Sequence, residues 1–158
     1  MAKMQVKPKV RGFICPSAHP KGCETMVKRW IEFVKQQALI TSPKRVLVIG
    51  SSTGYGLASR IVNTFSGQSQ TIGVMFERPA QGKRTASAGW YNTAAFEQLC
   101  QQEGLYAKTI NGDAFSTSVK EETIALIKKD WGQVDMVVYS LAFHGERTQK
   151  QVKFSNQF

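Results

Sequence analysis

The sequence predicts an α/β fold, with a doubly wound parallel sheet that is incomplete and has an N-terminal hairpin and helix attached. Three observations support this. Short apolar runs, the first over residues 45–49, alternate with longer segments of helical periodicity. The runs are rich in β-branched residues, as in strands that are buried on both faces. Strands and helices alternating at these lengths form right-handed βαβ crossovers, which make the sheet parallel.

Residues 1–43 are predicted to be a hairpin and a helix that pack on the core. The first part contains Pro8, Pro16 and Pro20, so it is expected to form a short hairpin or an extended arm. Residues 24–39 are predicted to be helical, because apolar residues recur at spacings of three and four and form one stripe. The members of that stripe, all expected in the core, are Val27, Trp30, Ile31, Val34 and Ala38.

Residues 44–142 are predicted to form the sheet domain. Its strands are expected at residues 45–49, 71–77, 105–110 and 134–141. Its helices are expected at residues 57–65, 91–102 and about 118–131. Ser118 and Glu121 have the spacing of a capping box at the start of the last helix. Gly104 suits the left-handed cap that ends the second.

Composition and charge exclude several function classes. The chain of 158 residues is 42% hydrophobic, and no apolar run approaches the roughly 20 residues that span a bilayer. The N-terminus lacks the apolar core of a secretion signal, so we expect a cytoplasmic protein with no membrane partner. The net charge is +10, but the basic residues are spread along the chain without a nucleic-acid-binding motif. We therefore expect anionic small molecules or an acidic carrier protein as partners, and no nucleic acid.

The cysteines predict neither a disulfide framework nor a metal site. Their number, three, is odd, and reduced thiols are the default in a cytosolic protein. Cys15, His19 and Cys23 are spaced by four and could share a helix face. Because Pro16 and Pro20 interrupt that helix, we expect no zinc there.

A glycine-rich loop follows the first predicted strand. Gly50 permits a tight turn out of the strand, Gly54 lets the backbone approach a pyrophosphate, and Gly56 lets the next helix pack close to the sheet. The helix N-terminus supplies free N–H groups and a positive dipole end for phosphates. This arrangement predicts a Rossmann-like nicotinamide-dinucleotide site, with hydroxyl donors from Ser51, Ser52 and Thr53.

Three further loops lie at the carboxyl ends of predicted strands. Glu77 is placed to accept hydrogen bonds from the adenosine ribose, and its charge would repel a 2′-phosphate, which favours NADH; the adjacent Arg78 argues the other way. Asp113 could accept from the adenine amino group, or its segment, which begins with Asn-Gly, could simply be a turn. Small residues at the end of the fourth strand, residues 139–142, leave room for the nicotinamide ribose.

Several segments together carry a family resemblance. They are KPKVRGFIC, AHPKGCE, KRVLVIGSSTGYGLASRI, TIGVMFERP, AGWYNTAAF, EGLYAKTINGDAFS and GQVDMVVYSLA, between Met4 and Ala142. They resemble the NADH-dependent enoyl reductases of the FabV and trans-2-enoyl-CoA reductase type, large monomeric relatives of the short-chain dehydrogenases. The resemblance places NADH contacts on Gly50, Ser51, Ser52, Thr53, Gly54, Tyr55, Phe76, Glu77, Asp113, Ala114, Leu141 and Ala142.

The resemblance also implies an activity. Such enzymes reduce the 2,3 double bond of an enoyl thioester in fatty-acid synthesis, with hydride passing from NADH to the β-carbon. A tyrosine, followed by a lysine after eight intervening residues, stabilises and protonates the enolate. The thioester is carried on acyl carrier protein or coenzyme A, both of which are anionic and would suit a basic surface.

This chain departs from the family in two respects. Members are much longer, and no tyrosine here has a lysine at the required spacing, so the catalytic pair is expected beyond residue 158. We therefore expect an inactive N-terminal part of a reductase; the alternative is a non-catalytic NAD-binding or regulatory module. Residues 143–158 have no family character. Reading permissible codons from the third base of the Phe143 codon spells PWRTNPKTGEVFKSV, which resembles the family and suggests a frameshift.

Overall fold

The computed structural model describes residues 7–13, 15, 17–82 and 84–141. Within them, four strands form one parallel sheet in the order β3-β2-β1-β4. The strands are β1 (Arg45–Ile49), β2 (Gln70–Met75), β3 (Ala107–Asn111) and β4 (Met136–Tyr139). The chain reverses its order across the sheet after β3, which is the doubly wound arrangement. The predicted fold class is therefore confirmed.

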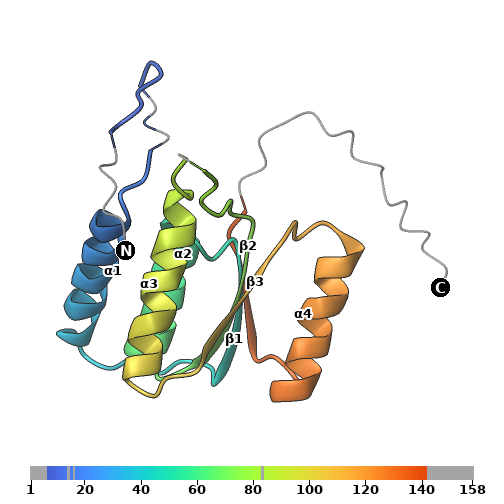
Figure 1. Cartoon of the computed structure of the whole chain (residues 1–158). Coiled ribbons are helices and arrows are strands. Elements are labelled where there is room, and N and C mark those ends of the chain that lie inside the picture. The colour runs from blue at the N-terminus through green and yellow to red at the C-terminus, as the bar shows by residue number, and fades with distance from the viewer. Residues whose placement is uncertain (1–6, 14, 16, 83, 142–158) are drawn as a thin grey trace.

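The helices cover the sheet unequally (Figure 1). Helices α2 (Gly54–Phe65) and α3 (Ala88–Gln102) lie on one face, and α1 (Pro20–Lys35) lies outside them as a further layer. Within the described part of the chain, helix α4 (Thr117–Asp130) is the one helix on the other face. The α1–α3 side has a core of eight buried residues: Val27, Ile31, Leu57, Ile61, Phe65, Ala95, Phe96 and Cys100.

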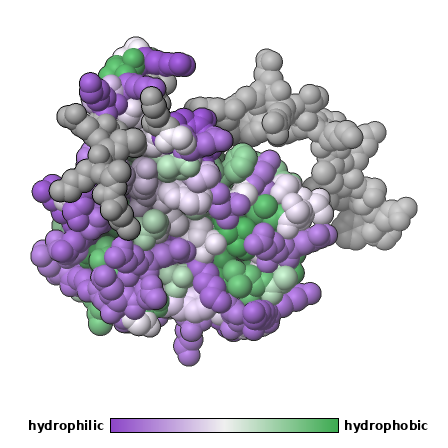
Figure 2. Space-filling model, in the orientation of Figure 1, coloured by the Kyte–Doolittle hydropathy of each residue, from purple (hydrophilic) through white to green (hydrophobic). Residues whose placement is uncertain are grey.

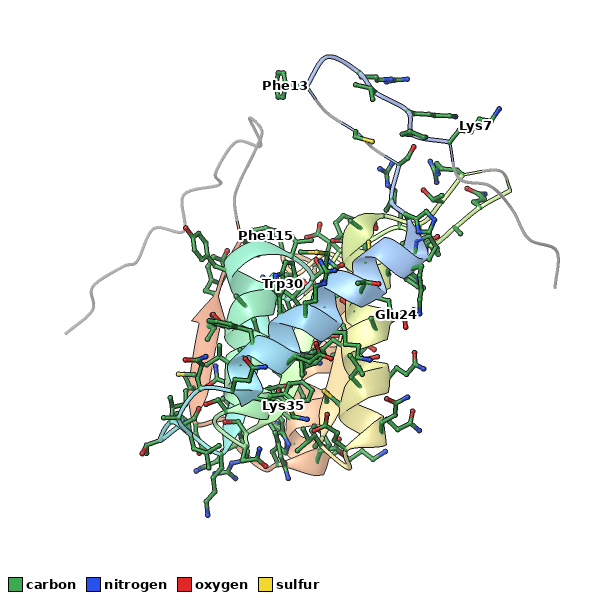
Figure 3. All side chains as sticks on the ribbon, turned by 90° about the vertical axis from the view of Figure 1, so that its left-hand side faces the viewer. Lys7, Phe13, Glu24, Trp30, Lys35 and Phe115 are labelled. Carbon is green, nitrogen blue, oxygen red and sulfur yellow. The ribbon has the colours of Figure 1, made fainter. Side chains whose placement is uncertain are left out.

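Helix α1 differs from its prediction at both ends. It begins at Pro20 because proline needs no N–H acceptor in the first turn, and His19 caps it by accepting a hydrogen bond from the Gly22 N–H at Nδ1, 3.2 Å away. The helix starts four residues before the predicted Glu24, and it ends at Lys35 rather than at Leu39. Cys15 and His19 precede it, so no helix carries Cys15, His19 and Cys23 on one face, as expected. Val27 and Ile31 are buried as predicted, but Trp30 is 42% exposed and is not in the core (Figure 3).

Helix α4 begins differently from its prediction. Its N-cap is Ser116, whose Oγ accepts from the Val119 N–H at 3.3 Å, so the predicted capping box of Ser118 and Glu121 is wrong. Ser116 is held in place because its own N–H and hydroxyl both donate to the carbonyl of Asp113. The cap thus ties the start of α4 to the loop after β3.

Residues 7–13, 15 and 17–19 form a projecting arm (Figure 1), and these described residues contain no β-strand. The Lys9 N–H donates to Ser17 Oγ at 2.9 Å, and that hydroxyl donates to the Lys7 carbonyl at 3.4 Å. These bonds bring the two halves of the arm together, in agreement with a short hairpin or arm. No helix among the described residues is long and apolar enough to cross a membrane.

Candidate dinucleotide-binding site

The glycine loop connects β1 to α2 and leaves no room for side chains at two positions. Gly50 has a φ of +85°, and a Cβ there would collide with the Ser140 carbonyl at the end of β4. A Cβ on Gly56 would collide with the Gly50 carbonyl. The loop, the helix and the end of β4 therefore meet at van der Waals distance. The roles predicted for Gly50 as a turn and Gly56 as a close-packing position agree with this geometry.

The first turn of α2 is open to a ligand. Gly54 has a φ of +53°, and nothing lies within 4 Å of where its Cβ would be. Thr53 is the N-cap but makes no side-chain cap bond, and Tyr55 is 87% exposed. The first N–H groups of a helix have no intrahelical acceptor, and the helix dipole is positive there. This surface can therefore take an anion such as a pyrophosphate.

The hydroxyls of Ser51 and Ser52 are used within the protein, contrary to their predicted role as free donors. Ser51 is completely buried, and its Oγ donates to the Val74 carbonyl at 3.2 Å. Ser52 Oγ donates to Glu77 Oε1 at 2.6 Å. Both serines thus fasten the loop to the end of β2. Of the three predicted hydroxyl donors, Thr53 is the exposed one.

Glu77 is held at the end of β2 from several sides. Its N–H donates to Asn111 Oδ1 at 2.8 Å, and Asn111 Nδ2 donates to its carbonyl at 3.0 Å. Its carboxylate lies so close to Gly89 that a Cβ there would collide with Oε1. Because β2 ends at Met75, the preceding Phe76 has left the sheet and is exposed. Glu77 therefore presents a fixed carboxylate beside the glycine loop.

The loop after β3 is both a turn and a potential contact. Asp113 Oδ1 accepts from the Phe115 N–H at 2.9 Å, which is the turn expected of this segment. The other carboxylate oxygen retains its acceptor capacity. Ala114 is half-buried and packs against the core on the α4 side.

The segment that follows β4 borders the site, next to the glycine loop. Ser140 continues the ladder, because its N–H donates to the Ile49 carbonyl at 2.8 Å. Leu141 is half-buried, and Ala142 lies outside the described residues. The structure thus brings the four predicted loops to one edge of the sheet, at the carboxyl ends of its strands.

Sequence reasoning missed a buried arginine beneath this edge. Arg60 on α2 is completely buried; its guanidinium donates to Thr71 Oγ1, Thr109 Oγ1 and the Lys108 carbonyl. Burial lowers the pKa of Arg60 to about 10, so the group stays protonated at neutral pH. Gly73 on β2 has no side chain, which leaves room for this guanidinium. A lone charge among the apolar positions of a predicted helix was the available signal.

Two asparagines and a glycine were also missed. Asn111 braces Glu77, Gly89 makes room for it, and Asn92 Nδ2 donates to the Ser52 carbonyl at 3.2 Å. Within the described residues, no group of three or more His, Cys, Asp or Glu side chains is placed to hold a metal ion.

Comparison with known protein families identifies the family of this chain. Residues 5–82 match the NAD(P)H binding domain of trans-2-enoyl-CoA reductase, and residues 84–156 match the catalytic region of the same enzyme. The chain belongs to the trans-2-enoyl-CoA reductase family. The family resemblance predicted from the sequence is confirmed. The second match also extends across most of residues 143–158, for which a frameshift remains a prediction.

Individual relatives agree with the family match. An enoyl-acyl-carrier-protein reductase of Coxiella burnetii, named for NADH, is 63% identical over 141 residues, 88% of this chain and 35% of that protein. A trans-2-enoyl-CoA reductase of Ruminiclostridium cellulolyticum, also named for NADH, is 62% identical over 139 residues, again 88% and 35%. The chain therefore spans about a third of the length of these relatives.

A solved structure has the same fold. A Clostridium trans-2-enoyl-CoA reductase in complex with NADH superimposes with a TM-score of 0.84 and 40% sequence identity, covering 89% of this chain and 35% of that one. The architecture of sheet and helices described above is thus shared with an experimentally determined member of the family.

Proposed function

We propose that this chain binds NADH across the carboxyl edge of its sheet. The observation that carries the proposal is the carboxylate of Glu77, fixed beside the glycine loop by Ser52 and Asn111. In this class of site an acidic residue at the end of the second strand accepts hydrogen bonds from the adenosine ribose. Its charge disfavours the 2′-phosphate of NADPH. The relatives named for NADH and the NADH complex of a homologue support the same cofactor.

The rest of the cofactor follows from this anchor. The pyrophosphate would lie on the open first turn of α2, at Thr53, Gly54 and Tyr55. The adenine would lie between the loops that carry Phe76 and Asp113, while Leu141 and Ala142 would contact the nicotinamide end. Gly50, Ser51 and Ala114 would shape the site through the backbone. When bound, NADH supplies a hydride.

We further propose that the whole protein to which this sequence corresponds reduces the 2,3 double bond of an enoyl thioester. The relatives named above act on enoyl-acyl-carrier-protein or enoyl-CoA substrates according to their names. Because no tyrosine of this chain has a lysine at the catalytic spacing, the 158-residue chain itself would bind NADH without reducing the thioester. It would then act as an NAD-binding module.

Fluorescence titration tests the cofactor. The wild-type chain should bind NADH more tightly than NADPH. Glu77→Gln should weaken NADH binding about tenfold, the cost of losing charged hydrogen bonds, and should narrow the preference over NADPH. Glu122→Gln, an exposed carboxylate on α4, is the matched control and should leave both affinities unchanged. Absence of NADH binding by the folded wild-type chain would refute the proposal.

Two measurements test the proposals about activity and reading frame. Enoyl-thioester-dependent NADH oxidation by the pure 158-residue chain would show that it is catalytic after all. Sequencing the DNA that encodes residues 143–158 tests the frameshift: the idea fails unless the shifted frame spells the family-like string.

A further inference from the structure

A basic cleft lies beside the dinucleotide site. We use this name for the cavity of about 1240 Å³ between the N-terminal arm, the start of α1 and the loop of residues 78–88. Figure 3 shows the arm, with Lys7 and Phe13 labelled, standing beyond the N-terminal end of α1. Five cationic side chains line the cleft from two walls: Lys7, Lys9 and Arg11 from the arm, and Arg78 and Arg84 from the loop.

The charges of the basic cleft have no counter-charge in the described part of the chain. No aspartate or glutamate lines the cavity, and none of the five cations forms an ion pair there. Elsewhere on the surface, lysines do pair with carboxylates, as Lys21 does with Glu24 and Lys108 with Asp130. Like charges facing one another across a cavity repel, and a polyanion between the two walls would remove this repulsion.

The floor of the basic cleft is apolar. Met26 and Trp30 of α1 reach it, and they are 41% and 42% exposed although they stand on a helix whose other face is core. An exposed indole in a cavity is a stacking surface for a flat ring. Cations around an apolar, aromatic floor suit a ligand that carries both phosphates and a ring, which is the chemistry of a nucleotide.

The basic cleft adjoins the NADH site without belonging to it. Arg78 directly follows Glu77, and Asn92 in the cleft wall holds the Ser52 carbonyl. Three hydrogen bonds between Arg78 and Ser87 fix the base of the loop, so the wall that Arg78 begins is tied down. The only phosphates of NADH are its pyrophosphate, which the first turn of α2 accounts for. The cleft is therefore left for a second phosphorylated ligand.

We propose that the basic cleft binds the phosphorylated nucleotide end of a coenzyme A thioester, its 3′-phosphate and pyrophosphate lying between the arm and loop cations and its adenine on Trp30. This inference rests on the proposed function, because it assigns the carrier of the thioester substrate. A concave cavity of this size suits a small molecule better than it suits a carrier protein, which would need an extended surface.

Equilibrium titrations with the full 158-residue chain test this. The probes are coenzyme A, dephospho-coenzyme A, an apo acyl carrier protein, NADH and NADPH. The readout is tryptophan fluorescence, and a Trp30→Phe variant identifies the part of the signal that comes from Trp30 rather than from Trp90 and Trp131. The variant Lys9→Ala/Arg84→Ala removes one cation from each wall. The matched control, Lys120→Ala/Lys128→Ala, removes two exposed cations of α4 and changes the net charge equally.

We expect the cleft variant to lose coenzyme A affinity about tenfold or more while keeping its NADH affinity, and the control to keep both. Dephospho-coenzyme A should bind more weakly than coenzyme A to wild type. The proposal is overturned if cleft variant and control bind coenzyme A alike, or if the cleft variant selectively loses NADPH or the carrier protein instead. Failure of NADH to bind any folded variant would refute the proposed function, which is a separate result.

Discussion

The two faces of the sheet are covered by helices to different degrees. On one face α2 and α3 are themselves covered by α1, and the core there draws on three helices. On the other face, α4 is the one helix among the residues that the structure describes. Figure 2 shows hydrophobic side chains gathered between the sheet and α4, while the half of the view that holds α1–α3 is largely hydrophilic. Val137 and Tyr139 of β4 are 52% and 62% exposed, although their register partners Leu47 and Ile49 belong to or pack against the core on the α4 side.

The proposed contacts with the cofactor are divided between the two faces. The glycine loop and α2, on which the pyrophosphate would lie, belong to the face covered by α1, α2 and α3, here called the covered side. Ser51 and Ser52 fasten that loop to the end of β2, and Arg60 fastens α2 to β3. The loop after β3 leads instead into α4, and its Ala114 packs on the α4 face, here called the open side. The end of β4, where the nicotinamide would lie, belongs to the edge strand of the described sheet. Binding of the pyrophosphate should therefore depend on the covered side. The packing of the open side should contribute less to the stability of the fold.

The largest effect on NADH affinity is expected from a methyl group at Gly56, where the first turn of α2 crosses the glycine loop. Gly56→Ala puts a Cβ onto the Gly50 carbonyl, and neither backbone can yield without separating α2 from β1. NADH affinity should fall by about tenfold or more, with a lower midpoint of urea unfolding. Gly104→Ala, just after α3, is the control: its Cβ meets open space, so only the positive φ is penalised, by about 1–2 kcal/mol, and NADH affinity should be kept. Equal effects of the two variants would contradict the assigned packing.

A second pair of variants compares the two faces directly. Arg60→Met leaves the Lys108 carbonyl and two threonine hydroxyls without their donor inside the covered side, and should lower the free energy of unfolding by about 3 kcal/mol. Val137→Ala on the open side should cost less than about 1 kcal/mol, because half of that side chain is already in water. Urea denaturation gives both values. Similar losses would mean that the open face is as tightly packed as the covered one.

The sequence predicts this molecule well where the signals are local. Strand β1 and the roles of Gly50 and Gly56 follow from a buried run followed by glycines, and all are confirmed by the geometry. The functions of Ser51 and Ser52 could not be predicted, because their partners, Val74 and Glu77, lie 23 and 25 residues further on. Trp30 fits the apolar stripe of α1, yet periodicity does not show how wide a strip of the helix α2 and α3 cover.

Acid should loosen the open side first. Hydrogen bonds from Lys108 and Tyr106 lower the pKa of Asp130 at the end of α4, and Arg45 lowers the pKa of Asp135 just before β4. A lowered pKa in the folded state stabilises the fold above the unfolded value, about 3.9, and this contribution is lost as the pH falls through the folded value.

Hydrogen exchange measures this by region. Between about pH 4 and pH 2, protection should fall in α4 and β4 before it falls in α1–α3, and Asp130→Asn should remove part of the pH dependence in α4. Simultaneous loss of protection on both faces would contradict the difference between them.

The smallest expected effect is a change in the rate at which a single cysteine is alkylated. Cys100 is buried in the α1–α3 core, where desolvation raises the pKa of its thiol to about 12, while Cys15 on the arm is exposed. Since the thiolate is the reactive form, iodoacetamide at pH 8 should modify Cys15 quickly and Cys100 only as fast as the covered side opens. Mass spectrometry of timed samples separates the two. Because Arg60→Met weakens that side and Val137→Ala does not, only the first substitution should speed the labelling of Cys100. Acceleration by Val137→Ala would show that the two faces open as one unit.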